Sequence, residues 1–460
     1  MSLEPASLSE AASLIRSRQL SPVQLVEACL ERIASSSLNA FISVQPEAAM
    51  AAARQAQEAV AKGNYKGPLH GIPIAGKDNI DVLGVPTTAG SRIMNDRLPG
   101  EDAFVVGKLR AAGAIIIGKT NLHEFACGTT GVNPHFGPVR NPWDTQRITG
   151  GSSSGSAAAV ASGEALAALG TDTGGSIRIP AAFCGVVGLK PTYGRVSNGG
   201  TVPLSSSLDH VGPLCRNVED AATVLQAIAG LDPSDGSSVE MPVPDYQAAL
   251  ASGVAGLRIG VPREFFFEGL AGDVDAALRE AVRVFEKLGA QLSEVSLPQV
   301  DQVSQGVLVM LLSEALAYHE TWLAERPQDY GEDVRLRLEV ARKNSAVDYI
   351  NAGRLKVEVT SRWWQLFQEI DLLLTPTTTT APPSISEAQS PRPPSFIKLT
   401  NPFNFSGQPA ISLPCGFTSE GLPIGMQLVG RAWEETTILR AALAYEQATG
   451  WHKRRPPRSS

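Results

Sequence analysis

Three short segments rich in glycine, serine or lysine hold the residue types that could hydrolyse an acyl bond. In chain order they are Gly71–Asn79, Ile148–Ala159 and Gly170–Pro180. Taken alone, each has an ordinary structural interpretation: a strand ending in a surface lysine, a flexible linker and a tight turn. A serine hydroxyl becomes a nucleophile only when a positioned base takes its proton. Lysine can be that base if burial or a nearby cation keeps it uncharged.

The local sequence adds a clue for each segment. Lys77 ends the apolar run Ile72–Ala75 after one glycine, an odd position for a side chain that faces solvent. The run Ser152–Ser154 leads into an alanine-rich stretch, which weakens the linker interpretation without identifying a nucleophile. Two glycines precede Ser176, and consecutive glycines can turn backbone N–H groups inward, as an oxyanion hole requires. A tight turn explains this last segment equally well.

Taken together and in this order, the three segments resemble the amidase signature family. Further segments of the same pattern are Phe136–Asp144, Cys184–Thr192 and Gly421–Gln427. The resemblance covers most of the chain and is densest between residues 69 and 213. It implies an α/β fold in which one large domain is built on a mixed, twisted β-sheet with α-helices on both faces.

The resemblance also implies a role for each of three side chains. Ser176 matches the family's nucleophile, and Lys77 matches its general base. Ser152 matches the serine that bridges them and that follows a cis peptide bond, here Gly151–Ser152. The spacing of the two serines agrees with the family, which selects Ser152 from the run of three. We therefore expect a proton relay from Ser176 through Ser152 to Lys77, and an acyl-enzyme on Ser176.

Neighbouring residues are expected to support this triad. The tetrahedral oxyanion would be held by the backbone N–H groups of Thr173, Gly174, Gly175 and Ser176. Arg178 could bind a substrate carboxylate or form a structural ion pair with Asp172, and we favour the ion pair. To act as a base, Lys77 needs a pKa that falls from about 10.4 toward about 7–8. The apolar residues before it suit that change.

Helical and strand-like patterns alternate around these segments. Residues 5–62 are expected to form helices, one of which starts at Ser21–Gln24 with proline in its first turn. We expect a single domain over residues 1–460, with a core at about 65–220 and 370–450 and a more helical peripheral part at about 225–365. The expected strands are Gly71–Ala75, Ala114–Gly118, Ala165–Leu169, Val186–Leu189, Gln291–Val295, Asp371–Thr375 and Ile424–Val429.

Bulk composition argues against several classes of function. The net charge of −7 provides no basic surface for nucleic acid. The five cysteines are scattered without a CxxC pair, and His123–Cys127 begins like the zinc motif HExxH but ends in cysteine. We therefore expect neither a metal nor a cofactor. We see no secretory signal and no apolar stretch long enough to cross a bilayer, so we expect a cytoplasmic protein.

The expected reaction is hydrolysis of a carbon–nitrogen amide bond, with ester, carbamate, urethane and anilide bonds as further candidates. Apolar side chains in the segment 300–345 could roof an acyl or aryl pocket, or could only pack a peripheral helix. They are Met310, Leu311, Leu312 and Trp322. No second substrate-binding charge stands out, which favours neutral, partly apolar amides. As partners we expect a small-molecule amide substrate, no direct nucleic-acid or membrane contact, and a homodimer as the candidate assembly.

A different hydrolase class is the first alternative. The run Gly151–Gly155 satisfies G-x-S-x-G, the nucleophile elbow of α/β-hydrolases, and would make Ser153 the nucleophile. The histidines available to such an esterase are His210, His319 and His452. The elbow needs a strand directly before it, and Asn141–Thr149 is polar, contains proline and makes a poor strand. A binding protein that has lost its chemistry is disfavoured because all three triad residues are present.

The second alternative lies within the family and is the glutaminase A subunit of glutamyl-tRNA amidotransferase. Its active site belongs to the same class, but it works in a heteromer. Members of that kind carry an acidic residue shortly before an Asn-x-x-Gly segment, where it contacts the amino group of glutamine. Here Asn404–Gly407 follows Ser395–Thr400, which contains no carboxylate. The sequence therefore favours a stand-alone amidase.

Overall fold

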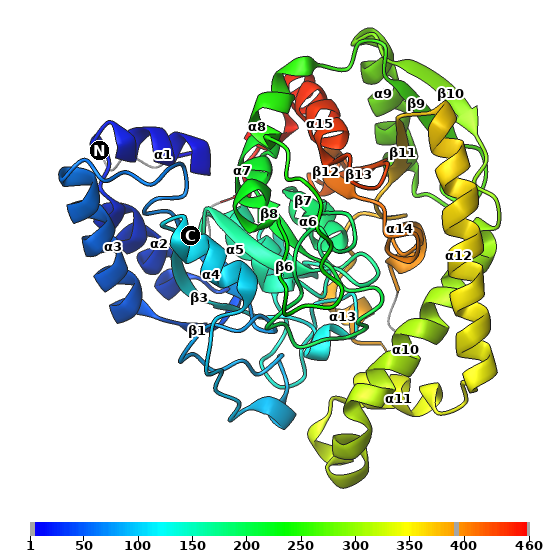
Figure 1. The fold of residues 1–460 in the computed structure, drawn as a ribbon, viewed down its shortest axis with the longest axis horizontal. Coiled ribbons are helices and arrows are strands. Elements are labelled where there is room, and N and C mark those ends of the chain that lie inside the picture. The colour runs from blue at the N-terminus through cyan, green and yellow to red at the C-terminus, as the bar shows by residue number, and fades with distance from the viewer. Residues whose placement is uncertain (1–4, 391–394, 458–460) are drawn as a thin grey trace.

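A mixed β-sheet of eleven strands runs through the computed structural model, which describes residues 5–390 and 395–457 (Figure 1). The strands of this sheet are β1 (Phe41–Val44), β2 (Pro73–Lys77), β3 (Ile115–Thr120), β6 (Ala167–Thr171), β7 (Val187–Lys190), β8 (Val211–Cys215), β9 (Arg258–Pro262), β10 (Gln291–Val295), β11 (Leu372–Pro376), β12 (Ala410–Phe417) and β13 (Pro423–Gly430). Across the sheet their order is β1-β3-β2-β6-β8-β7-β12-β13-β11-β9-β10. Two groups of three neighbouring strands, β3-β2-β6 and β11-β9-β10, are parallel, and the remaining pairs are antiparallel.

Helices lie on both faces of this sheet and at its two ends. They are α1 (Leu8–Arg16), α2 (Pro22–Ser35), α3 (Pro46–Ala61), α4 (Phe104–Ala111), α5 (Ser154–Ser162), α6 (Arg178–Cys184), α7 (Val218–Ile228), α8 (Tyr246–Ala249), α9 (Gly272–Lys287), α10 (Val300–Glu325), α11 (Glu332–Ala341), α12 (Ala346–Glu369), α13 (Ile385–Ala388), α14 (Pro402–Phe405) and α15 (Glu435–Thr449). Helix α2 begins where its sequence predicts, because Ser21 and Gln24 form a capping box and Pro22 is the first helical residue. This arrangement confirms the expected α/β fold.

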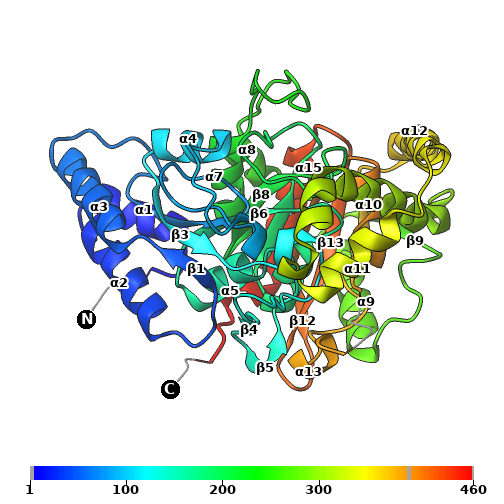
Figure 2. The same ribbon diagram turned by 90° about the horizontal axis from the view of Figure 1, so that it is seen from below.

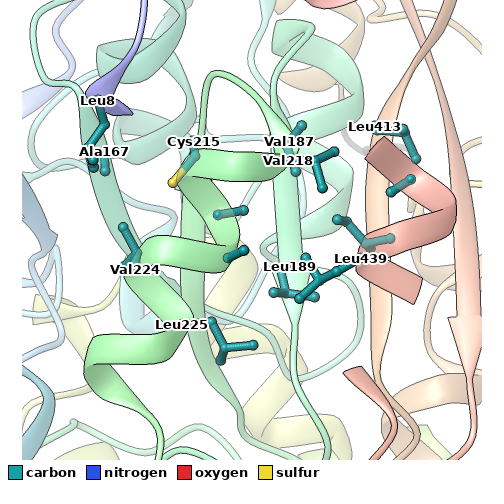
Figure 3. Packing of buried hydrophobic residues seen from close by; sticks show 14 of the residues in the cluster. Leu8, Ala167, Val187, Leu189, Cys215, Val218, Val224, Leu225, Leu413 and Leu439 are labelled. Atoms are coloured by element: carbon teal, nitrogen blue, oxygen red, sulfur yellow. The ribbon is translucent and has the colours of Figure 1, made fainter. Parts of the chain in front are cut away.

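The sheet separates two layers of buried apolar side chains. Ala167 of β6 and Cys215 of β8 belong to one buried cluster, whereas the adjacent Ala168 and Leu214 belong to another. Successive side chains of a strand point to opposite faces, so the two clusters lie on opposite sides of the sheet. Figure 3 shows the first cluster, in which side chains of α7 and α15 lie on those of β7 and β12. Helices α5 and α6 contribute to the second cluster.

The two ends of the sheet carry different helical layers. Helices α1, α2 and α3 gather at the β1 end, and the long helices α10 and α12 lie toward the β10 end (Figures 1 and 2). A third buried cluster joins α10, α11 and α12 to β11 and α14. In the described parts of the chain, no helix has both the length and the apolar character to cross a membrane.

One local expectation is wrong. The segment Asn141–Thr149, which we expected to be a poor strand, contains β5 (Asp144–Ile148), paired with β4 (Arg140–Asn141) in a separate two-stranded sheet. The Asn141 amide donates a hydrogen bond to the Ile148 carbonyl at 2.9 Å, so polar side chains stabilise this hairpin from within. A nucleophile elbow at Ser153 must therefore be judged from the contacts of Ser153 itself.

Candidate active site

Two residues of the expected triad are in direct contact. Lys77 is the last residue of β2, and its fully buried amine lies 2.8 Å from Ser152 Oγ and 2.7 Å from Thr171 Oγ1. Strand β6, which ends at Thr171, is the parallel neighbour of β2. The carboxyl ends of parallel neighbours meet at one edge of a sheet, and for this reason Lys77 and Thr171 lie together.

Ser176 is held beside this pair and faces a cavity. Its carbonyl accepts a hydrogen bond from the Ser153 N–H at 3.1 Å, which ties the Ser176 loop to the serine run. The cavity wall includes Ser176, while Lys77 and Ser152 are fully buried. The peptide bond between Gly151 and Ser152 is cis. The structure thus brings all three segments to one place.

Glycine is required at two positions around these serines. A Cβ at Gly170 would lie 2.8 Å from Ser153 Oγ, so the serine run can pack on β6 only if residue 170 lacks a side chain. Gly175 has a φ of +131°, and a Cβ there would collide with the side chain of Thr400. Residues with a side chain rarely adopt such a φ, which explains the glycine immediately before Ser176.

Burial sets the charge state of the lysine. Loss of hydration lowers the pKa of Lys77 to about 7, while the negative charges of Asp209 and Asp172 act in the opposite direction. A substantial fraction of the amine is therefore neutral near neutral pH, and a neutral amine can accept a proton.

A buried ion pair organises the Ser176 loop. Arg178 Nη2 lies 2.9 Å from Asp172 Oδ1, and both side chains are fully buried. Burial opposes ionisation of Asp172, but the Arg178 guanidinium holds the pKa of this carboxyl well below its usual range. Asp172 also accepts hydrogen bonds from the N–H groups of Gly175 at 2.8 Å and Ile177 at 3.1 Å. Arg178 is thus occupied inside the protein, where it holds the carboxylate around which the loop folds.

The expected oxyanion donors divide into two groups. The N–H of Gly175 is already used by Asp172. Those of Thr173, Gly174 and Ser176 donate no hydrogen bond to any described residue, and all three residues line the cavity. Three unused donors on one wall can stabilise an oxygen that becomes negatively charged.

The cavity has a volume of about 310 Å³. Its described lining consists of Ala126, Cys127, Gly128, Thr129, Thr173, Gly174, Ser176, Leu204, Leu308, Leu311, Leu312, Arg337, Ser395 and Ile397. Of the four expected roof residues, Leu311 and Leu312 line it. Met310 is buried in the cluster beneath α10, and Trp322 packs on Tyr318.

Arg337 of α11 is the charged residue that the sequence did not reveal. Its guanidinium donates a hydrogen bond to the Cys127 carbonyl at 2.7 Å and lies 3.9 Å from the carboxylate of Asp333. Its spacing from Asp333 is that of an ordinary surface ion pair on a helix, so nothing local distinguishes it. The sequence analysis saw no second charge that could bind a substrate, and the structure places this cation in the cavity wall.

The contacts of Ser153 disfavour the α/β-hydrolase alternative. Its Oγ donates to the Thr171 carbonyl at 3.1 Å and accepts from the Thr171 N–H at 3.2 Å. The two buried candidate histidines form no hydrogen bond with Ser153 among the described residues. His210 is hydrogen-bonded to the Leu208 carbonyl, and His319 is hydrogen-bonded to the Tyr330 hydroxyl. Ser153 is a structural link between the serine run and β6.

The fold and the cavity agree with a class of enzymes that act on amide bonds, and the chain belongs to the Amidase family, whose profile matches residues 24–439. It is 44% identical to the A subunit of the glutamyl-tRNA(Gln) amidotransferase of Chloroflexus aggregans, over 98% of this chain and 97% of that relative. The peptide amidase of Stenotrophomonas maltophilia has a similar structure, with a TM-score of 0.86, 33% identity and 98% coverage of each chain.

Another similar structure is that of a vestigial protein complex that reveals the origins of an s-triazine catabolic enzyme. It superposes with a TM-score of 0.92 at 36% identity, over 96% of this chain and 98% of that one. This protein is thus an amidase-family enzyme that acts on amide bonds. Among the expected functions, full-length similarity to amidotransferase A subunits supports the glutaminase alternative better than a stand-alone amidase.

The comparisons also correct the expected partners. We expected a small-molecule substrate, no direct nucleic-acid or membrane contact, and a homodimer. The relatives are instead subunits of a glutamyl-tRNA(Gln) amidotransferase, and one of the most similar structures is a protein complex. A partner surface can be only about as apolar as the rest of a protein's exterior, so composition gave no sign of one.

Proposed function

We propose that this chain is the amide-hydrolysing subunit of an amidotransferase-type assembly, and that it cleaves small primary amides that also carry a carboxylate. The observation that carries the proposal is the position of Ser176. It lies on the wall of the cavity that Arg337 also lines, and its carbonyl accepts from the N–H of Ser153. The preceding residue, Ser152, contacts the Lys77 amine.

The proposed reaction uses these groups in sequence. Neutral Lys77 takes the proton of Ser152, which takes the proton of Ser176 as its Oγ forms a bond to the amide carbon. The carbonyl oxygen becomes an oxyanion that accepts hydrogen bonds from the free N–H groups on the wall. Ser152 then protonates the nitrogen and regains a proton from the Lys77 ammonium, the C–N bond breaks and ammonia leaves. Water hydrolyses the acyl-enzyme through the same relay and restores Ser176.

The cavity also indicates the class of substrate. An arginine fork suits a carboxylate, and Leu308, Leu311 and Leu312 of α10 can pack on the carbon chain between carboxylate and amide. No carboxylate is present among the described lining residues to pair with an ammonium group. We therefore favour dicarboxylic acid monoamides. Glutamine, which adds an ammonium group, is the second candidate because the relatives are amidotransferase subunits.

Three substrates of similar length separate these possibilities. Glutaramate has the skeleton of glutamine without its amino group, and pentanamide lacks the carboxylate. We expect the purified chain to release ammonia from glutaramate with a kcat/KM at least tenfold above that for pentanamide, since a charge-assisted hydrogen bond contributes about 1.5–3 kcal/mol. Equal rates for both would refute recognition of a carboxylate. A rate for glutamine above that for glutaramate would favour the glutaminase.

Replacement of Arg337 tests the same cavity directly. Arg337→Ala should raise KM for glutaramate by about tenfold or more and abolish the preference over pentanamide, because it removes the cation. The matched control is Arg335→Ala on the same helix, where the guanidinium pairs with Glu339 at 2.6 Å and is not part of the cavity wall. If the two variants behave alike, Arg337 does not bind the substrate.

A further inference from the structure

Asp209 is a buried carboxylate on the loop before β8. Among the described residues no lysine, arginine or histidine forms an ion pair with it, and its exposed fraction is 6%. Three hydrogen bonds partly offset its burial, which raises the pKa of Asp209 to about 6: Thr173 Oγ1 donates to Oδ1 at 2.5 Å, and the N–H groups of Leu204 and Ser205 donate to Oδ2 at 2.9 and 3.0 Å. A buried charge is costly unless such donors compensate it, so this arrangement requires an explanation.

Two of the three donors belong to residues that line the active-site cavity. Thr173 and Leu204 both line it, and Thr173 is one of the residues with an unused N–H beside Ser176. The hydroxyl of the third donor, Ser205, bonds at 2.8 Å to Glu314 of α10, the helix that supplies the apolar wall. One carboxylate thus connects the Ser176 loop, the 204–205 wall and, through Ser205, helix α10.

Asp209 also acts electrostatically on the candidate base. Asp209 and Asp172 are the carboxylates whose charges raise the pKa of Lys77 against the effect of burial, and Asp209 has the larger influence. The charge of Asp172 is balanced by Arg178, whereas Asp209 has no such partner among the described residues.

Other ionisable groups surround these carboxylates. Glu314 faces Asp209, and Lys356 of α12 faces Glu314. Tyr193 lies near Asp209, and Lys190 lies near Asp172. Lys77 is the buried amine whose charge Asp209 influences directly.

We propose that Asp209 is a positioning residue for amide hydrolysis: its carboxylate fixes Thr173 and Leu204 around Ser176, and its negative charge acts on the Lys77 amine. The inference rests on the proposed function of Ser176 and Lys77, and it adds a fourth side chain to their chemistry. Geometry and charge are separate contributions, so two substitutions can distinguish them.

The first substitution, Asp209→Asn, removes the charge and keeps the shape. The amide oxygen can accept from the N–H groups of Leu204 and Ser205, and its NH₂ can donate to Thr173 Oγ1. Without the negative charge the ammonium form of Lys77 is less stable. The acidic limb of kcat/KM should therefore move to lower pH by roughly one unit, as expected when a nearby opposite charge is lost. An unshifted limb would overturn the electrostatic part of the proposal.

The second substitution, Thr173→Val, removes the hydroxyl that donates to Asp209 and leaves the Asp209 carboxyl in place. We expect kcat on the plateau above the acidic limb to fall about tenfold or more, because the neighbouring oxyanion donors lose their fixed position. Thr173→Ser keeps the hydroxyl and should restore most of kcat. Full activity of Thr173→Val would overturn the positioning part.

The chain offers a matched control in Asp220. This buried carboxylate lies in the first turn of α7. It also accepts from two backbone N–H groups, those of Leu8 and Ser9, and from the Ser9 hydroxyl, all at the start of α1. Asp220→Asn should lower the melting temperature without moving the pH profile. If it shifts the limb as Asp209→Asn does, the effect is general and the proposal is wrong. If Asp209→Asn does not fold, the comparison of Thr173→Val with Thr173→Ser tests the proposal instead.

The proposed function has its own test in Ser176→Ala. An inactive Ser176→Ala together with an Asp209→Asn that behaves like Asp220→Asn would leave the proposed function intact and reject only the role of Asp209. An active Ser176→Ala would reject both.

Discussion

Lys77 has an unusual position for a lysine, at the end of a buried strand with its amine between two hydroxyls. Ser152 and Thr171 are its hydrogen-bond partners, and the loss of hydration lowers its pKa to about 7. Lys119 provides a contrast, because it is equally buried but is paired with Asp78 at 3.1 Å. A lysine with hydroxyl partners only can give up its proton, and a lysine in an ion pair tends to keep it.

This difference predicts the pH dependence of the enzyme. At pH below the pKa of Lys77 the ammonium prevails and cannot accept a proton, so kcat/KM should rise with pH through about 7 and then level off. Rates measured from pH 5 to 9 with glutaramate test this. Lys77→Ala should lower kcat by several orders of magnitude. Lys119→Met should reduce the stability of the fold and leave the pH at which kcat/KM rises unchanged. A flat wild-type profile would contradict the assignment of the base.

For single residues, the sequence predicted those site residues that belong to a motif and did not predict those that do not. Ser152 and Ser176 stand in recognisable glycine-rich segments, and the structure brings those segments to one place. Arg337 and Asp209 are distant in sequence from both and have ordinary neighbours. Their position became apparent only when α11 and the loop before β8 were placed at the cavity.

Among the elements, the loop between β6 and α6 is held by a buried ion pair. The Arg178–Asp172 pair fixes its course, and Arg178 also donates to the Thr400 carbonyl at 2.9 Å and to Gln427 Oε1 at 3.0 Å. The segment 400–427 is thereby fastened to the same loop.

Removing the guanidinium should therefore destabilise the fold. Arg178→Ala leaves the Asp172 carboxylate buried without its partner, and we expect the free energy of unfolding to fall by about 3–5 kcal/mol. Urea denaturation of the purified variant measures this. The control Arg279→Ala breaks the Arg279–Asp275 pair on the exposed face of α9 and should cause no measurable change. A loss in Arg178→Ala no larger than in the control would show that the ion pair does not hold the loop.

Which elements could be predicted depended on their local pattern. Apolar runs bounded by glycine predicted strands that overlap β2, β3, β6, β7 and β13. Strands β8 and β12 carry prolines at Pro213 and Pro414, which a sequence pattern does not favour inside a sheet. The hairpin β4–β5 was missed because polar residues form it through hydrogen bonds rather than through burial.

For the whole molecule, the sheet is the feature that joins all parts of the chain. Its strands come from residues 41–44 at one edge and from residues 258–295 near the other. The segment 225–365, expected to be a more helical peripheral part with a strand at Gln291–Val295, contributes that strand as β10 and also β9 to the sheet. We propose that the chain is one folding unit.

This proposal predicts one unfolding transition. Far-ultraviolet circular dichroism reports on all helices, while tryptophan fluorescence reports on sites such as Trp363 in the α12 layer. In a single cooperative unit the two denaturation curves coincide. Separate midpoints would show that the α10–α12 layer unfolds independently and would contradict the single domain.

Covalent labelling of the nucleophile tests the central claim most directly. An activated fluorophosphonate traps the serine that a base deprotonates, and peptide mass spectrometry then locates the adduct. We predict one adduct per chain, on the peptide that contains Ser176, and none in the Ser176→Ala variant. An adduct on Ser152 or Ser153 in the wild-type protein, or labelling that survives in Ser176→Ala, would contradict the assignment of Ser176 as the nucleophile.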